Sequence, residues 1–259
     1  MRMMKKVLGT VTVLALSVSL LAGCGSTAVS PVSSTASTVA ESTTSSVVSE
    51  TTSAAADENA AAAAQLLNDL TGSYQELWPV ILADEYQQTW LDNCTALVGE
   101  ENAEAAFEKL SSMVTGDVYG EDAVEAYANG GGAYFCGFTN SLATLTFDGE
   151  TSTISGTDKD GNVLFSHTYH YIGMEPVHGL YEFESDDADS GEFTYFFLAP
   201  DTSAETYHIE FRYGSDAEAL SQYDAGEYAY WVASGISTDC DQTMIDNCIE
   251  LFCTENLAG

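Results

Sequence analysis

Basic residues are scarce in this sequence. Six lysines and arginines stand against 40 aspartates and glutamates, so the formal net charge at pH 7 is −34. Such a charge repels nucleic acid and attracts cations, which argues against a nucleic-acid partner. Solubility alone explains much of this acidity, so a metal site has to be identified from specific ligands.

Recognisable catalytic motifs are also absent from the sequence. It contains no GxSxG, no HExxH and no phosphate-binding P-loop. Serines, threonines and acids are plentiful, but no spacing ties one of them to a base. We therefore expect a protein that is not an enzyme.

Cysteines are few, and no two of them have the CxxC spacing that a thiolate zinc site needs. An odd number follows Cys24, so these thiols cannot all pair within one chain. An exported protein permits a structural disulfide, and the sequence leaves that possibility and its partners open. The five are Cys94, Cys136, Cys240, Cys248 and Cys253.

The N-terminus has the features of a lipoprotein signal peptide, which we assign to residues 1–23. A basic start precedes an apolar run over residues 7–21, and the run ends in LLAGC. This ending resembles a bacterial lipobox, which implies cleavage before Cys24 and lipid attachment to its sulfur; the alternative is a simple signal peptide. Two acyl chains suffice for stable anchoring. The expected location is the cell membrane, lipid-anchored on its extracytoplasmic face.

A low-complexity segment follows. Residues 26–56 are almost entirely Ser, Thr, Ala and Val, with no aromatic residue, Leu or Ile. Such a composition buries too little apolar surface to fold, so residues 24–56 are predicted to be the lipidated cysteine and a disordered tether. A flexible chain of this length spans roughly 30 Å. The remaining residues, 57–259, suit one folded domain.

Helical spacing of apolar residues dominates the first part of that domain and returns at its end. Asp57 favours a helix start, and Pro79 breaks any helix that begins earlier. The predicted helices cover residues 57–70, the stretch from Asp84 to about 97, and residues 101–110, 121–128, 215–223 and 241–252.

Between these helices the apolar period changes to two, in β-rich runs divided by turn signals. An antiparallel meander of many short strands closes its edges best as a barrel. The expected fold class is a calycin- or lipocalin-like β-barrel with added α-helices, α+β overall. The predicted strands cover residues 133–138, 142–147, 151–155, 162–173, 180–185, 192–199 and 206–213.

Two acidic turns lie between these strands. Asp158–Asn162 (DKDGN) resembles the start of a calcium loop but lacks the later ligands, so a hairpin turn is favoured. Ser185–Glu192 gathers several carboxylates, and a solvated hairpin tip is favoured there over a weak calcium site.

The histidines differ in their settings. His167 and His170 are three apart on one strand and should face opposite sides, while His178 precedes a glycine and should lie in a turn. Each is expected to be a hydrogen-bonded structural histidine. His208 and Glu210 are two apart on a strand, so both project to one face. An imidazole and a carboxylate side by side suit zinc, although the spacing alone fits an ordinary barrel strand as well.

Several stretches, in this order along the chain, resemble the ZinT (YodA-like) domain family from about Gly72 to the C-terminus. The most specific is HIEFRYGSD, which aligns without gaps with the family's HxHxxxGxD-like run. The stretches are GSYQELWPVILADEYQQTW, HTYHYIGMEPV, LYEFES and AETYHIEFRYGSDAEAL.

The resemblance implies a calycin-type barrel that binds zinc, and also cadmium, outside the cytoplasm. It further implies an ABC-type metal transporter, or its binding protein, as a partner. The family's first metal-binding histidine corresponds to His208 and its second to Glu210. The third ligand, a histidine in the family, falls near Ala199–Asp201 here, where Asp201 is the candidate. The family's histidine-rich loop is missing.

The leading hypothesis from the sequence is therefore an extracytoplasmic lipoprotein that binds Zn²⁺ or another divalent cation through His208, Glu210 and Asp201. It would be accessory to metal uptake or homeostasis. The alternative is a calycin-type module that has lost the metal site and binds a small organic ligand or a protein partner.

Overall fold

The computed structural model describes residues 58–200 and 208–258. The expected signal peptide (residues 1–23), the lipidated Cys24 with its tether (24–56) and Asp201 all lie outside the described residues. A search of the described part of the chain for helices with the length and hydropathy of a membrane span gives no candidate.

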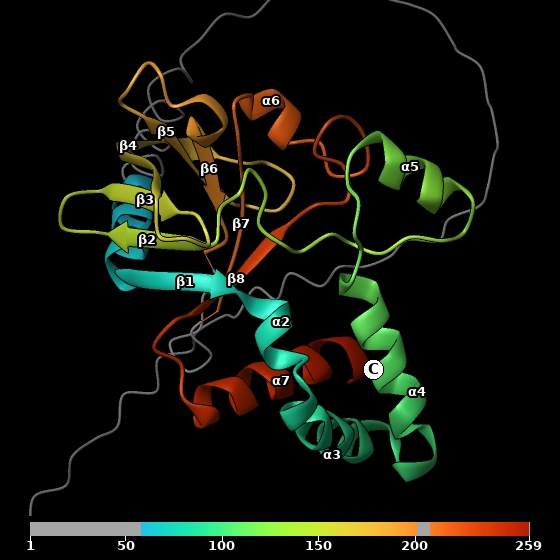
Figure 1. The fold of residues 1–259 in the computed structure, drawn as a ribbon. Helices are drawn as coiled ribbons and strands as arrows, with labels where there is room; N and C mark the ends of the chain where they lie inside the picture. Colours follow the sequence, from blue (N-terminus) through green and yellow to red (C-terminus); the bar gives the residue numbers. More distant parts are fainter. Residues whose placement is uncertain (1–57, 201–207, 259) are drawn as a thin grey trace, which may run out of the picture.

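The centre of the fold is a closed antiparallel barrel. Each strand pairs with its neighbour in sequence, and β1 closes the barrel against β8 (Figure 1). The predicted β-barrel with added helices is thus confirmed. The strands are β1 (Gly72–Glu76), β2 (Thr144–Asp148), β3 (Thr153–Thr157), β4 (Val163–Met174), β5 (Tyr181–Ser185), β6 (Tyr195–Leu198), β7 (His208–Gly214) and β8 (Ala233–Ser237).

The strand prediction fails at three places. The run 133–138 is no strand: Phe135 makes only isolated bridges, to Thr115 and Trp231. Scattered backbone hydrogen bonds hold this segment instead of a ladder, among them those from the Phe135 amide to Tyr230 at 3.0 Å and from the Ser234 amide to Cys136 at 3.0 Å. At its end the Glu76 side chain accepts from the Phe138 amide at 2.6 Å. Sequence reasoning missed β1 and β8, whose sequences GSYQE and ASGIS show little apolar alternation.

Each predicted helix is present, while several of their ends differ. The short helix α2 (Leu77–Ile81) is a correction, because Pro79 is expected to break a helix that begins before it and instead lies inside one. Pro79 lies in the first turn of α2, where the helix needs no amide hydrogen from it. Residues 58–69 form the first helix. The others are α2 (Leu77–Ile81), α3 (Gln87–Val98), α4 (Glu100–Val114), α5 (Glu121–Ala128), α6 (Ala217–Leu220) and α7 (Gln242–Leu257).

The buried residues form two separate cores. Aromatic and aliphatic side chains from all around the barrel fill its interior, among them Phe147, Phe183 and Phe196. The second core lies between the barrel and the group α2, α3, α4 and α7, which gather on one side of it (Figure 1). Trp90 is at the centre of this second core and donates its indole N–H to the Ile81 carbonyl at 2.7 Å.

The turn between β3 and β4 is the predicted hairpin. Asp158 Oδ1 accepts hydrogen bonds from the amides of Asp160 and Asn162, each at 2.9 Å. The Asn162 side chain also donates to Asp158, and these bonds hold the pKa of the Asp158 carboxyl below its usual value. Carboxylate oxygens engaged in this way stabilise the turn itself.

Arg212, on β7, is a fully buried cation. Its guanidinium donates to the carbonyls of Leu220 and Tyr228, and to that of Gln222 at 3.2 Å. It also lies 4.2 Å from the centre of the Tyr223 ring, within cation–π range. One side chain therefore ties the segment after α6 to the outer face of the barrel.

We predict that Arg212→Met lowers the free energy of unfolding by about 3 kcal/mol, because buried carbonyls lose a charged donor. Urea unfolding measures the change. Lys109→Met is the matched control, since Lys109 is exposed on α4 and should change stability by less than about 0.5 kcal/mol. Equal effects of the two substitutions would contradict the structural role of Arg212.

The cysteines after Cys24 are all free thiols in this structure. Burial, and secondarily the charge of Glu210, raises the pKa of Cys136 and of Cys248 to about 12. In the folded protein both thiols therefore stay protonated at pH values well above those at which thiols usually ionise. Their contribution to stability is present at neutral pH and is lost as the pH rises from about 9.

We predict that iodoacetamide at pH 8 alkylates half-exposed Cys240 at least about tenfold faster than Cys136 and Cys248, because the thiolate is the reacting species. Peptide mass spectrometry of the folded protein measures the order. In urea the rates should converge. Rapid native labelling of Cys136 would show that this thiol is neither buried nor held protonated.

Candidate metal-binding strand and the adjoining cavity

β7 separates two environments by the alternation of its side chains. Ile209, Phe211 and Tyr213 are buried in the core that fills the barrel. His208 and Glu210 alternate with them and take the outer face, toward the helices. The structure therefore places both predicted ligands on one face of one strand, as their spacing indicates.

The hydrogen-bond ladder holds that strand on both sides. His208 lies opposite Ile236 and Glu210 opposite Ser234 on β8, and the Glu210 carbonyl accepts from the Ala199 amide at 2.9 Å. The side chains of both residues also interact within the protein. A closed barrel gives them a rigid support.

A cavity of about 430 Å³ opens beside Glu210, between the outer face of the barrel and the helices. Ser234 of β8 and Cys136 line it from the barrel side. Phe252 and Glu255 of α7 line it from the opposite side. His208 does not line the cavity, whereas Glu210 does.

A buried carboxylate shapes one wall of this cavity. Glu175 is fully buried and accepts from the amides of Val177 at 2.9 Å and His178 at 2.6 Å. The His178 ring packs on Tyr223 with ring centres 3.8 Å apart. His178 lies in a turn, as predicted, and the turn brings it to the cavity. The expectation of a hydrogen-bonded ring is wrong at Nδ1, which makes no hydrogen bond and lies 3.7 Å from Glu175 Oε2.

The donors on β7 meet part of what zinc requires. Zinc in proteins usually takes four ligands, or three and a water. His208 and Glu210 supply two of suitable chemistry. No group of three or more His, Cys, Asp or Glu side chains able to hold a metal occurs among residues 58–200 and 208–258. The described residues thus supply two candidate ligands. Asp201, the predicted third ligand, lies outside them.

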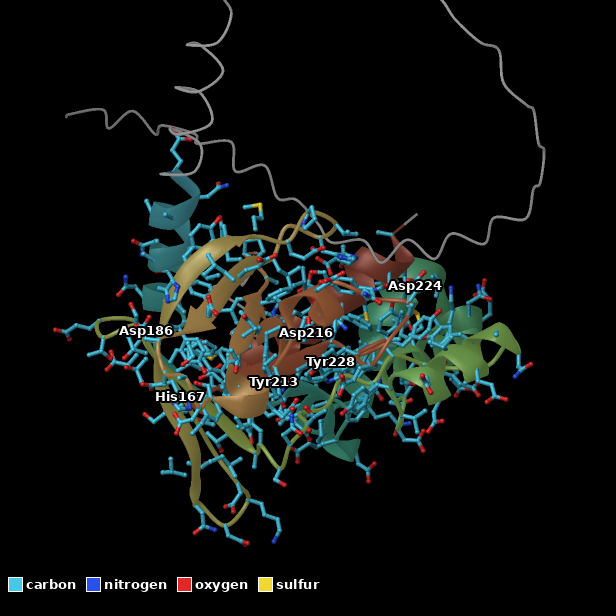
Figure 2. All side chains as sticks on the ribbon, turned by 90° about the horizontal axis from the view of Figure 1, so that it is seen from above. His167, Asp186, Tyr213, Asp216, Asp224 and Tyr228 are labelled. Carbon is cyan, nitrogen blue, oxygen red and sulfur yellow. The ribbon has the colours of Figure 1, made fainter. Side chains whose placement is uncertain are left out.

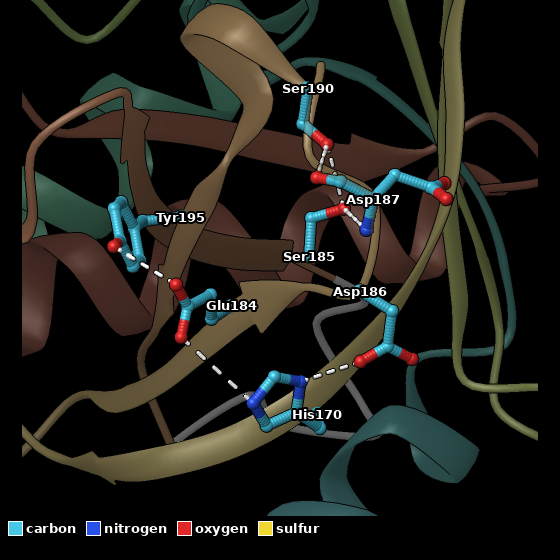
Figure 3. Close-up of polar contacts among 7 residues, drawn as sticks. All are labelled: His170, Glu184, Ser185, Asp186, Asp187, Ser190 and Tyr195. Atoms are coloured by element: carbon cyan, nitrogen blue, oxygen red, sulfur yellow. Dashed lines mark hydrogen bonds and ion pairs between the residues drawn. The ribbon is translucent and has the colours of Figure 1, made fainter.

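The remaining histidines belong to a different part of the barrel, where β4 meets β5. His170 Nδ1 lies 2.8 Å from Asp186 Oδ1, and its Nε2 lies 3.9 Å from Glu184 Oε2 (Figure 3). His167 pairs with Asp187 at 2.8 Å. In Figure 2, His167 and Asp186 lie on one side of the molecule, far from Asp224 on the other.

The two histidine–aspartate contacts account for the carboxylates of Asp186 and Asp187 in the turn after β5. His170 is half-exposed, whereas His167 is largely covered and lies over Phe165. They face opposite sides of β4, as predicted. The turn is closed by Ser190, whose hydroxyl donates to Ser185 Oγ at 2.7 Å (Figure 3). Asp186 and Asp187 therefore serve as histidine partners.

Sequence reasoning did not find the cavity. Its lining residues come from α2, α4, α7, β7, β8 and irregular segments that are distant in sequence. Phe252 lies in a predicted helix as an ordinary core position, and Trp78 lies where the sequence predicts no helix. The one available signal was Glu210, an outward carboxylate next to a buried strand face.

The comparisons with known proteins concern the fold. A scan of protein-family models and a search of curated proteins found no match. Among solved structures, the Zn(II)-bound ZinT-like domain of Streptococcus pneumoniae AdcA is similar, at 16% identity and a TM-score of 0.45, covering 71% of this chain and 89% of that one. Zn(II)-bound AdcA from the same organism matches at 14% identity and a TM-score of 0.42, covering 72% of this chain and 35% of its own.

Proposed function

We propose that this protein is an extracytoplasmic, lipid-anchored protein that binds a divalent cation such as Zn²⁺ and assists metal uptake or homeostasis. The observation that supports the proposal most directly is the position of His208 and Glu210, neighbours on the outer face of β7. In this proposal both are ligands, and Asp201 or water completes the coordination.

The chemistry of the pair favours reversible capture. Imidazole suits zinc and related ions, whereas a carboxylate is a harder and less zinc-selective ligand. A site with few protein ligands keeps positions open for exchange, which a protein that hands its ion to a transporter requires. The surrounding acidity, a formal charge of −34 for the chain, concentrates cations near the site.

The N-terminal part of the chain completes this proposal. Lipid attachment at Cys24 would keep the protein at the membrane, and the tether over residues 24–56 would let the barrel reach a neighbouring ABC-type metal transporter or its binding protein. The role is binding and transfer of the ion, with no catalytic step. The ion is cargo.

We predict that zinc titration of the full chain by calorimetry reveals one site and that His208→Ala weakens it about 100-fold or more. Substituting even a residue that only hydrogen-bonds to a metal ligand typically lowers the metal affinity about 10–100-fold. Moderate salt suppresses diffuse attraction to the acidic surface. His170→Ala is the matched control, a half-exposed histidine on β4 that should leave the affinity unchanged.

Glu210→Gln provides a separate test of the second ligand. This substitution removes the charge at nearly constant shape, and it should weaken zinc binding as His208→Ala does. Weak binding of many ions, with an affinity that neither substitution changes, would refute a site on β7. An unchanged affinity in Glu210→Gln alone would remove Glu210 from the ligand set.

A further inference from the structure

The cavity beside β7 has the dimensions and walls of a small-molecule site. Its volume of about 430 Å³ falls within the range of about 300–1,000 Å³ found for ligand pockets, which are mostly apolar with a few polar groups. Aromatic side chains from four separate segments line it: Trp78, Tyr134, Tyr223 and Phe252. Such a concentration of ring faces offers both apolar contact and π-surface.

Three buried polar atoms belong to residues that line this cavity: Trp78 Nε1, His178 Nδ1 and Tyr223 Oη. None of them makes a regular hydrogen bond within the described residues. Each nevertheless has a polar neighbour, because His178 Nδ1 lies 3.7 Å from Glu175 Oε2, Tyr223 interacts with Arg212, and Trp78 interacts with Cys136. The walls of the cavity and its charge, and not unpaired donors, therefore indicate what it can bind.

The charge around the cavity is negative. Glu210 and Glu255 line it, and buried Glu175 lies behind His178, 3.7 Å from its Nδ1. The nearby cation, Arg212, already donates to backbone carbonyls. A carboxylate ligand would be repelled here, whereas an ammonium group would meet carboxylates and aromatic faces, the combination that recognises organic cations.

We propose that this cavity binds a small organic cation, an amine with an apolar or aromatic body. The ammonium group meets the carboxylates of Glu210 and Glu255, and the body lies against the aromatic walls. The cavity shares Glu210 with the metal pair, whereas His208 does not line it, and the amine can be tested with the metal removed.

The test compares ligands that share one body and differ in charge. The full chain is titrated by calorimetry, with EDTA and moderate salt, using tyramine, the alcohol of the same hydroxyphenylethyl body, and 3-(4-hydroxyphenyl)propionate. EDTA removes metal, and salt screens diffuse attraction to the acidic surface. Tyramine should bind at one site at least about tenfold more tightly than the alcohol, and the carboxylate should not bind.

A matched pair of substitutions on α7 locates the site. Glu255→Gln should weaken tyramine about tenfold, because it removes a carboxylate at the cavity. Glu250→Gln removes an exposed carboxylate of the same helix that does not line the cavity, and it should have no effect. Both positions are exposed, so both variants should fold.

The remaining outcomes each overturn the proposal. Absence of tyramine binding up to millimolar concentration would exclude an amine of this size. Equal binding of the three compounds would show a cavity that accepts apolar bodies regardless of charge. Equal weakening by Glu255→Gln and Glu250→Gln would reduce the amine to a counter-ion of the acidic surface.

Discussion

The buried guanidinium of Arg212 is the interaction on which the outer face of the barrel depends. A charge out of water is costly unless it is hydrogen-bonded, and here backbone carbonyls of Leu220, at the end of α6, and of the segment after it accept from both terminal nitrogens, while Nε has no partner among the described residues. The same contact stacks Tyr223 over the cation. Tyr223 in turn supports His178, so one arginine positions two residues of the cavity wall.

The packing of the barrel decides where a ligand can bind. Small eight-stranded barrels either fill their interior with side chains or keep a pocket there. Here Phe147, Phe196, Phe211 and other large side chains are almost fully buried inside, and they occupy the lumen. A cavity lies on the outside of the barrel instead, under the helices. Side-chain alternation on β7 sends Glu210 toward that outer space.

Local periodicity was enough to predict most of the barrel and the shared face of His208 and Glu210. It failed for β8, where ASGIS is buried on both faces and shows no alternation, and for residues 133–138, which scattered backbone hydrogen bonds hold in place of a strand ladder. The cavity could not be predicted from the sequence, because Trp78 and Phe252 become neighbours of β7 only after the helices pack. Asp201 lies outside the described residues, so its predicted role stays a prediction.

Glu210 connects the two proposed sites. It stands beside His208 on β7 and also lines the cavity, so its carboxylate faces whatever cation either site receives. A charge shared in this way makes the two ligands competitors: an ammonium group in the cavity reduces the attraction of Glu210 for a metal ion, and the reverse holds by reciprocity. If both sites bind, metal and amine affinities should each fall when the other is present. Glu210→Gln should abolish this coupling, while Glu255→Gln should leave the metal affinity unchanged.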